Sequence, residues 1–383
     1  MERIYFDNNA TTQPAPVVIQ KMLRYLDEHF GNPSSGHRYG EAARHGLEQA
    51  RARVATLINA EPNRVIFTSG GTEANNMAIA SGAAANPARK HLLTSAVEHA
   101  SVLKPLEFLA RHQGYQLEVL PVATDGGLDL EEVAAAIRPE TALVSLMAAN
   151  NETGVVWPLA EIAALCRSRS VFFHCDAVQM AGKEEIDVRR LGVDYLSLAG
   201  HKLHGPKGIG ALYVRRGAPL VPLILGAGQE NGQRAGTENV AAAVGFGKAC
   251  ELAVESLPHY RSRISVMRDR LEKEILAAIP EARINGNEQP RLANTINVSF
   301  KNCASGALIQ ELDERGIAVS AHAACHSGDL TPSHVLAAMQ VPETFQHGTL
   351  RISLSRFNTM DEVEALLAVL PGIVARSRRG FAA

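Results

Sequence analysis

The sequence predicts an α/β protein in which helices cover both faces of a mainly parallel sheet. The first observation is that short apolar runs alternate with longer segments of helical periodicity between residues 65 and 214. The second is that most of these runs are mainly apolar, as in parallel strands buried on both faces. The third is the length of 383 residues, which exceeds one average domain and predicts a second, smaller lobe.

Two helices are expected before the first strand, because apolar residues recur at helical spacing over 16–29 and 39–58. Gly and Pro within 31–36 indicate a turn between them. A strand over 65–68 then leads into a helix that opens within 69–76. Further strands are expected near 91–94, 116–120, 142–147, 171–175, 193–198 and 209–214, and further helices near 100–112, 129–137 and 158–169.

The last third of the chain predicts the smaller lobe. A long helical pattern begins after Thr237 and continues to about Ala278, and we expect Pro258 to break it. From Asn294 onward the pattern alternates strand and helix three times. We therefore predict a large domain over 14–257, and a smaller α+β domain made of 1–13 and 258–383.

Composition narrows the class of protein. Hydrophobic residues at 46% and charged residues at 20% are typical of an ordinary globular protein. A net charge of −2, without basic clusters interleaved with aromatics, argues against nucleic acid and favours a small substrate. The N-terminus does not resemble a signal peptide, and no run approaches the roughly 20 apolar residues of a membrane helix. We expect a cytoplasmic protein without membrane association.

The five cysteines predict neither a disulfide framework nor a zinc site, because their number is odd and no Cys-x-x-Cys spacing occurs. Cys325 differs from the others, since it follows small and polar residues and lies near His322 and His326, a setting that favours a reactive thiolate. A metal site formed by these three side chains is the alternative. Three cysteines are expected to be small buried side chains: Cys166, Cys250 and Cys303.

Lys202 lies in a glycine-rich loop between the strands expected over 193–198 and 209–214. The glycines let the backbone turn tightly and approach a ligand, and the adjacent His201 can donate to an anion. A lysine amine that loses its proton can form a Schiff base with an aldehyde cofactor. A basic surface hairpin is the alternative.

Two more segments place polar groups at the carboxyl ends of expected strands. Gly71 and Thr72 open a helix directly after a strand, where free N–H groups and the helix dipole favour a phosphate; a capped helix start is the alternative. Asp176 follows an apolar strand, in the crevice where such sheets bind ligands. Its carboxylate could keep a pyridine nitrogen protonated, or it could simply cap a helix.

Three further residues are candidates. Asn151 follows a strand and could donate to a ring oxygen, unless it only forms a turn. His99 could stack on a ring or shuttle protons, or it could cap the helix that follows it. Arg351 lies on an apolar strand and must be paired, either with a substrate carboxylate or with an internal acidic residue.

Together these segments resemble the cysteine desulfurases of the NifS/IscS type, which are pyridoxal-phosphate enzymes of fold type I. The matching motifs span nearly the whole chain in the family's order. They are Tyr5-Phe-Asp-Asn-Asn-Ala-Thr-Thr12, Gly31-Asn-Pro-Ser-Ser35, Thr68-Ser-Gly-Gly-Thr-Glu-Ala-Asn-Asn76, Glu98-His99, Asn150-Asn-Glu-Thr-Gly154, Asp176-Ala-Val-Gln179, Gly200-His-Lys-Leu-His-Gly-Pro-Lys-Gly208, Arg234-Ala-Gly-Thr237, Ala324-Cys325 and Leu350-Arg351.

The resemblance implies a large domain with a seven-stranded sheet and a role for each matching residue. Lys202 would form the Schiff base with pyridoxal 5'-phosphate, and Asp176 would pair with the pyridinium nitrogen. Gln179 and Asn151 would bind the ring oxygen, and His99 would lie on the ring face. Thr72 and His201 would hold the phosphate. Thr237 would reach the partner's cofactor across a homodimer.

The resemblance also implies the reaction. Arg351, with Asn32 or Asn151 nearby, would hold the carboxylate of L-cysteine. Lys202 would take the α-proton, and the Cys325 thiolate would attack the substrate sulfur. Alanine would leave, and a persulfide on Cys325 would pass to an acceptor protein or thiol for iron–sulfur cluster assembly or another sulfur-containing product.

The chain departs from the family pattern in two places. Ala199 stands where the family usually has a serine that helps hold the phosphate; loss of that hydrogen bond would weaken cofactor binding by roughly 1.5–3 kcal/mol unless water or Ser197 substitutes. Residues 321–325 read Ala-His-Ala-Ala-Cys instead of Ser-Gly-Ser-Ala-Cys, and loss of that glycine stiffens a loop that must swing. Sulfur delivery and acceptor choice are the steps that this change affects.

Two other functions fit parts of the sequence. A selenocysteine lyase, or another pyridoxal-phosphate lyase or aminotransferase, would make no persulfide and would not need Cys325. A non-catalytic sulfur-carrier scaffold or regulatory partner would not need Lys202 and Asp176, which are both present.

Overall fold

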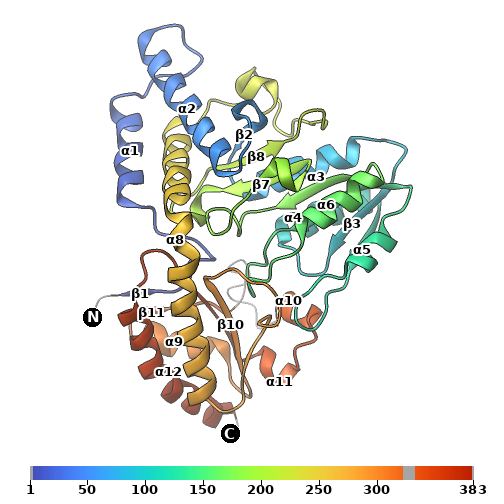
Figure 1. Cartoon of the computed structure of the whole chain (residues 1–383). Coiled ribbons are helices and arrows are strands. Elements are labelled where there is room, and N and C mark those ends of the chain that lie inside the picture. The colour runs from blue at the N-terminus through green and yellow to red at the C-terminus, as the bar shows by residue number, and fades with distance from the viewer. Residues whose placement is uncertain (1–2, 322–332, 382–383) are drawn as a thin grey trace.

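The computed structural model describes residues 3–321 and 333–381. Its larger sheet has seven strands in the order β2-β8-β7-β6-β5-β3-β4, and only β8 runs antiparallel to its neighbours. The predicted, mainly parallel sheet is therefore confirmed (Figure 1). The strands are β2 (Val65–Thr68), β8 (Gly210–Val214), β7 (Tyr195–Ala199), β6 (Phe172–Asp176), β5 (Thr141–Met147), β3 (His91–Ser95) and β4 (Gln116–Leu120).

Helices bury this sheet on both faces. Along β5, Leu143 packs into a cluster with Val102 and Leu106, whereas Val144 packs into another with Ile162. Neighbouring residues of one strand thus point into different cores, which explains why β5 is mostly apolar. The helices are α1 (Pro16–Asp27), α2 (Arg38–Leu57), α3 (Gly71–Ala84), α4 (Ala100–His112), α5 (Leu130–Ala136), α6 (Leu159–Ser168) and α7 (Val188–Leu191).

The C-terminal residues form two smaller sheets with their own helices. An antiparallel sheet has the order β12-β10-β9, and β1 pairs in parallel with β11, so the N-terminal segment lies among the C-terminal elements (Figure 1). The short strand β9 was not predicted. The elements are β1 (Ile4–Tyr5), β9 (Ala282–Ile284), β10 (Thr295–Phe300), α9 (Ser305–Asp313), β11 (Ile317–Ala318), α10 (His334–Ala338), α11 (Glu343–Gln346), β12 (Thr349–Ser353) and α12 (Met360–Phe381).

Helix α8 (Val240–Ala278) corrects one prediction, because it continues through Pro258 without a break. Proline removes one hydrogen bond of the helix, and packing on both sides of it holds the helix together. Buried residues up to Ala253 belong to the core beneath the large sheet, and those from Tyr260 onward belong to the C-terminal core. The division into two domains near Pro258 remains a prediction, and this change of core is the observation in its favour.

Three expectations from composition can be compared with the structure. Cys166, Cys250 and Cys303 are buried, as predicted. Within residues 3–321 and 333–381, no group of three or more His, Cys, Asp or Glu side chains could hold a metal ion. None of the helices in these ranges combines the length and apolarity needed to cross a membrane.

Candidate active site

A cavity of about 250 Å³ lies where β5, β6 and β7 end and where α3 and α4 begin. This is the edge at which parallel sheets usually bind ligands. Most of the predicted site residues line it: Gly71, Thr72, His99, Asn151, Asp176, Gln179, His201, Lys202 and Arg351.

Three predicted site residues do not belong to this group. Asn32 is exposed, does not line the cavity, and uses its side-chain oxygen to accept from the Ser34 N–H at 2.9 Å. Thr237 is also exposed and does not line the cavity of its own chain. Cys325, with the neighbouring histidines, lies outside the described residues.

Lys202 ends a short 3₁₀ turn (Gly200–Lys202) that directly follows β7. Its Nζ donates to the main-chain oxygens of Asn9 and Ala10, the latter at 2.8 Å. The predicted place of Lys202 in a loop between two strands is confirmed. These oxygens are neutral acceptors that hold the amine at the cavity wall.

Asp176 is the last residue of β6, and its carboxylate is buried at the cavity. Asn75 Nδ2 donates to one carboxylate oxygen at 2.7 Å, and the Val178 N–H donates to the other at 3.0 Å. Neutral donors therefore orient the carboxylate without neutralising its charge, which leaves it able to bind a cation.

The start of α3 forms another wall of the cavity. A Cβ on Gly71 would lie 2.8 Å from a methyl carbon of Val178, so a larger residue does not fit there. The first N–H groups of this 14-residue helix can bind an anion. Ala199 also lines this part of the cavity and brings no hydroxyl group.

His201 lies beside this wall, and its Nδ1 is 3.2 Å from Thr11 Oγ1. Burial, reinforced by the charges of Lys202 and Lys207, lowers the pKa of His201 to about 4. The imidazole is therefore neutral at physiological pH and can donate a hydrogen bond to an anion without adding positive charge.

His99 caps a helix, as one of its two predicted roles requires, and it also lies at the cavity. It accepts from the Ser101 N–H at 3.1 Å at the start of α4. Its Nδ1 is 2.8 Å from Ser101 Oγ, which accepts from Asn75 Nδ2 at 2.8 Å. Because Asn75 also donates to Asp176, a chain of hydrogen bonds joins His99 to the carboxylate.

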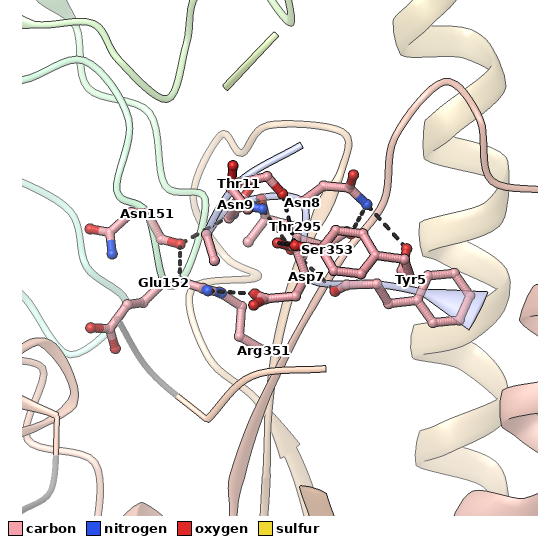
Figure 2. A network of polar contacts seen from close by, with 12 residues as sticks. Tyr5, Asp7, Asn8, Asn9, Thr11, Asn151, Glu152, Thr295, Arg351 and Ser353 are labelled. Carbon is pink, nitrogen blue, oxygen red and sulfur yellow. Dashed lines mark hydrogen bonds and ion pairs between the residues drawn. The ribbon is translucent and has the colours of Figure 1, made fainter. Parts of the chain in front are cut away.

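Arg351 on β12 is 1% exposed and has an internal acidic partner, the alternative left open above. Its Nη2 lies 2.7 Å from Asp7 Oδ1, and its Nη1 donates to the Asn151 main-chain oxygen at 3.2 Å (Figure 2). Its Nε has no hydrogen-bond partner in the described part of the chain. The guanidinium still lines the cavity, so a substrate carboxylate would share it with Asp7.

Asn9 also lines the cavity, and sequence reasoning assigned it no role. Its Nδ2 donates to Thr295 Oγ1 at 2.8 Å and to the Asn151 main-chain oxygen at 3.2 Å, and its N–H donates to Ser353 Oγ at 2.9 Å (Figure 2). Its main-chain oxygen accepts from Lys202 and from Gln179 Nε2. Asn9 thus connects the ends of the large sheet to the C-terminal strands.

Glu98 is fully buried near the cavity. Its Oε1 accepts from Ser95 Oγ at 2.8 Å and from the Met147 N–H at 3.0 Å, and its Oε2 has no partner in the part of the chain that the structure describes. Burial, with a contribution from the Asp176 charge, raises the pKa of Glu98 to about 8. Glu98 is therefore a neutral acid at pH 7.

Replacing Glu98 with glutamine is expected to change how stability depends on pH. Between the ordinary pKa of about 4.5 and the folded value of about 8, the wild-type protein binds a proton on folding, so its stability falls as pH rises. Glu98→Gln removes this loss, and its free energy of unfolding relative to the wild type should rise by about 1.4 kcal/mol per pH unit. Urea unfolding from pH 5 to pH 8 measures this difference in the free energy of unfolding.

Glu288→Gln is the control, because Glu288 is exposed. If the free energy of unfolding of Glu98→Gln and of the wild type depended on pH in the same way, Glu98 would not be a buried neutral acid.

Comparison with known proteins identifies the family. The aminotransferase class-V family matches residues 4–366. The chain belongs to this family. The cysteine desulfurase of Cereibacter sphaeroides is 50% identical, over 99% of this chain and 97% of the relative. The cysteine desulfurase NifS of Azotobacter vinelandii is 45% identical, over 99% and 94%.

Solved structures of class-V aminotransferase relatives show the same fold. A NifS-like protein superposes with a TM-score of 0.92 at 36% identity, over 98% of this chain and all of that one (100%). The structure titled "SspA in complex with cysteine" has a TM-score of 0.82 at 37% identity, over 93% and 100%. The predicted fold class is confirmed, and the class-V enzymes depend on pyridoxal phosphate.

Proposed function

We propose that this chain is a cysteine desulfurase that converts L-cysteine to L-alanine and passes the sulfur to an acceptor as a persulfide on Cys325. The observation that carries the proposal is a single cavity bordered by the Lys202 amine, the Asp176 carboxylate and the start of α3, with Arg351 on its wall. Relatives named cysteine desulfurases match 99% of the chain, which supports the choice of reaction within the family.

The cavity residues fit pyridoxal 5'-phosphate. When bound, this cofactor supplies an aldehyde that condenses with amines and a ring that withdraws electrons. Lys202 would bind the aldehyde carbon, and Asp176 would hold the ring nitrogen in its protonated state. Gly71, Thr72 and His201 would hold the phosphate at the start of α3, where the close approach of Val178 allows only glycine at residue 71.

Gln179 and Asn151 would bind the ring oxygen, and His99 would cover the ring face. Gln179 Nε2 already donates to the Asn9 main-chain oxygen at 3.0 Å, so its second hydrogen would serve the cofactor. Because Ala199 provides no hydroxyl group, we expect the phosphate to be held more weakly than in relatives with serine there.

The substrate would bind with its carboxylate on Arg351, next to Asn151. Lys202 would then take the α-proton, because its amine is held at the cavity wall by neutral acceptors. The Cys325 thiolate would attack the substrate sulfur, so that an S–S bond forms while the carbon–sulfur bond breaks and the three-carbon product leaves as alanine after protonation. Thr237 would serve the partner's cofactor in a homodimer, which agrees with its exposure and its place outside this cavity.

The test is alanine formation from L-cysteine by the cofactor-loaded protein, with Cys325→Ala beside it. The wild type is expected to form alanine and sulfide in the presence of a thiol, and Cys325→Ala neither, while both keep the visible cofactor absorbance. Cys166→Ala is the matched control, because this thiol is buried. Alanine formation by Cys325→Ala at the wild-type rate would contradict persulfide chemistry and favour a lyase, such as a selenocysteine lyase.

A further inference from the structure

Lys183 is a buried ammonium group that the proposed reaction does not use. It follows β6 in the sequence and is 5% exposed. Its Nζ donates to Gln179 Oε1 at 3.0 Å and to Asn9 Oδ1 at 3.3 Å. Within residues 3–321 and 333–381, no carboxylate lies within ion-pair distance of it: Asp7 pairs with Arg351, and Asp176 is held by Asn75.

The charges that shift the pKa of Lys183 are positive. Burial is the main cause that lowers the pKa of Lys183 to about 7, and the charges of Lys202 and Arg351 add to it. Two histidines on which its charge acts, His201 and His204, are held neutral by burial and nearby positive charges, Lys183 among them. An isolated buried ammonium is costly, and an apolar side chain of similar size would serve packing better.

Lys183 lies close to Lys202. Both side chains bond to Asn9, Lys183 to its side-chain oxygen and Lys202 to its main-chain oxygen. They also line one small cavity of about 10 Å³, together with Tyr260 and Arg356. The charge of Lys183 therefore acts on the Lys202 nitrogen through protein rather than through bulk water.

Lys183 also fixes the amide of Gln179. The ammonium can only donate, so it bonds to Oε1 and leaves Nε2 to donate to the Asn9 main-chain oxygen. A flipped amide would place two donors together at Lys183 and two acceptors together at Asn9. Lys183 thus ensures that Gln179 presents an N–H group to the cavity.

We propose that Lys183 is a positioning residue, which orients the Gln179 amide toward the cofactor's ring oxygen and disfavours protonation of the Lys202 nitrogen. The proposal rests on the proposed function, since it assumes that the cavity binds pyridoxal phosphate. A residue with a purely structural role would not shift the protonation of the Lys202 nitrogen.

The test is the pH dependence of the visible absorbance of the cofactor-loaded protein, in the wild type and three variants. Lys183→Met removes the positive charge that Lys183 carries below its pKa of about 7. The Lys202 nitrogen then holds its proton more easily in that range, so the midpoint of the absorbance change is expected to rise by roughly one pH unit. Lys183→Arg keeps the charge and should stay near the wild-type midpoint. Lys104→Met, at a position with a 73% exposed side chain, is the control.

The outcomes separate this proposal from the proposed function. A normal cofactor band whose midpoint is the same in Lys183→Met and the wild type would overturn the role of Lys183 alone. A lower unfolding temperature of Lys183→Met with an unchanged midpoint would show a structural role and also overturn it. A wild type without any cofactor band would overturn both proposals. If Lys183→Met does not fold, Lys183→Gln gives the same midpoint test.

Discussion

Replacing Lys202 with alanine is expected to lower alanine formation by at least about 10³-fold and to remove the visible absorbance of the bound cofactor. A positioned proton-transfer group alone contributes about 10²–10⁴-fold, and Lys202 would also be the attachment point of the cofactor. The amine donates to the main-chain oxygens of Asn9 and Ala10, which are neutral, so its loss leaves no buried charge without a partner at these two bonds. Steady-state alanine formation and the absorbance spectrum measure the two effects.

Lys207→Ala is the matched control for Lys202→Ala, because Lys207 lies in the same loop but is exposed. It should retain wild-type activity and absorbance. Unfolding temperatures of both variants in the absence of cofactor should lie within a few degrees of the wild type. Activity of Lys202→Ala above a hundredth of the wild-type rate would show that another group transfers the proton.

Replacing Asp176 with alanine is expected to lower kcat/KM by about 10²-fold or more, the effect of removing a preorganised charge that stabilises a transition state. Without the carboxylate, the ring nitrogen of the cofactor loses the group that keeps it protonated. Asn75 Nδ2 and the Val178 N–H also lose their acceptor, so some stability is lost as well. Kinetics of alanine formation and cofactor binding by dialysis measure the effect.

Asp176→Asn separates charge from hydrogen bonding. Asparagine can still accept from Val178, but it has no negative charge and brings an N–H donor toward Asn75 Nδ2. A large loss of activity in Asp176→Asn, with partial recovery in Asp176→Glu, is the expected pattern. An Asp176→Asn variant with wild-type kcat/KM would show that the charge has no role.

Much of the site could be predicted because it lies at strand ends. Asp176 and Lys202 follow apolar runs that the sequence shows clearly, and parallel strands bring such ends to one edge of the sheet. The start of α3 could be predicted in the same way, because it directly follows the end of β2. These residues needed only local patterns and one topological rule.

The residues that were missed depend on contacts between distant parts of the chain. In the sequence, Asn9 is an ordinary polar residue, and only the fold shows its hydrogen bonds to Thr295 and Ser353. Lys183 resembles a surface lysine in the sequence, and only the fold shows that it is buried and bonded to Asn9. Pro258 was misjudged for a related reason, since the packing that keeps α8 continuous comes from two separate cores. Composition and periodicity contain no information on such pairings.

The bonds between the N-terminal segment and β12 have a consequence for biosynthesis. Ser353 accepts from the Asn9 N–H at 2.9 Å and donates its own N–H to the Phe6 main-chain oxygen at 2.7 Å. Asn9 is synthesised 344 residues before Ser353, so these bonds cannot form until β12 has left the ribosome. The cavity that Asn9 lines is therefore completed only after β12 has been synthesised, and a chain that ends before β12 would lack these bonds.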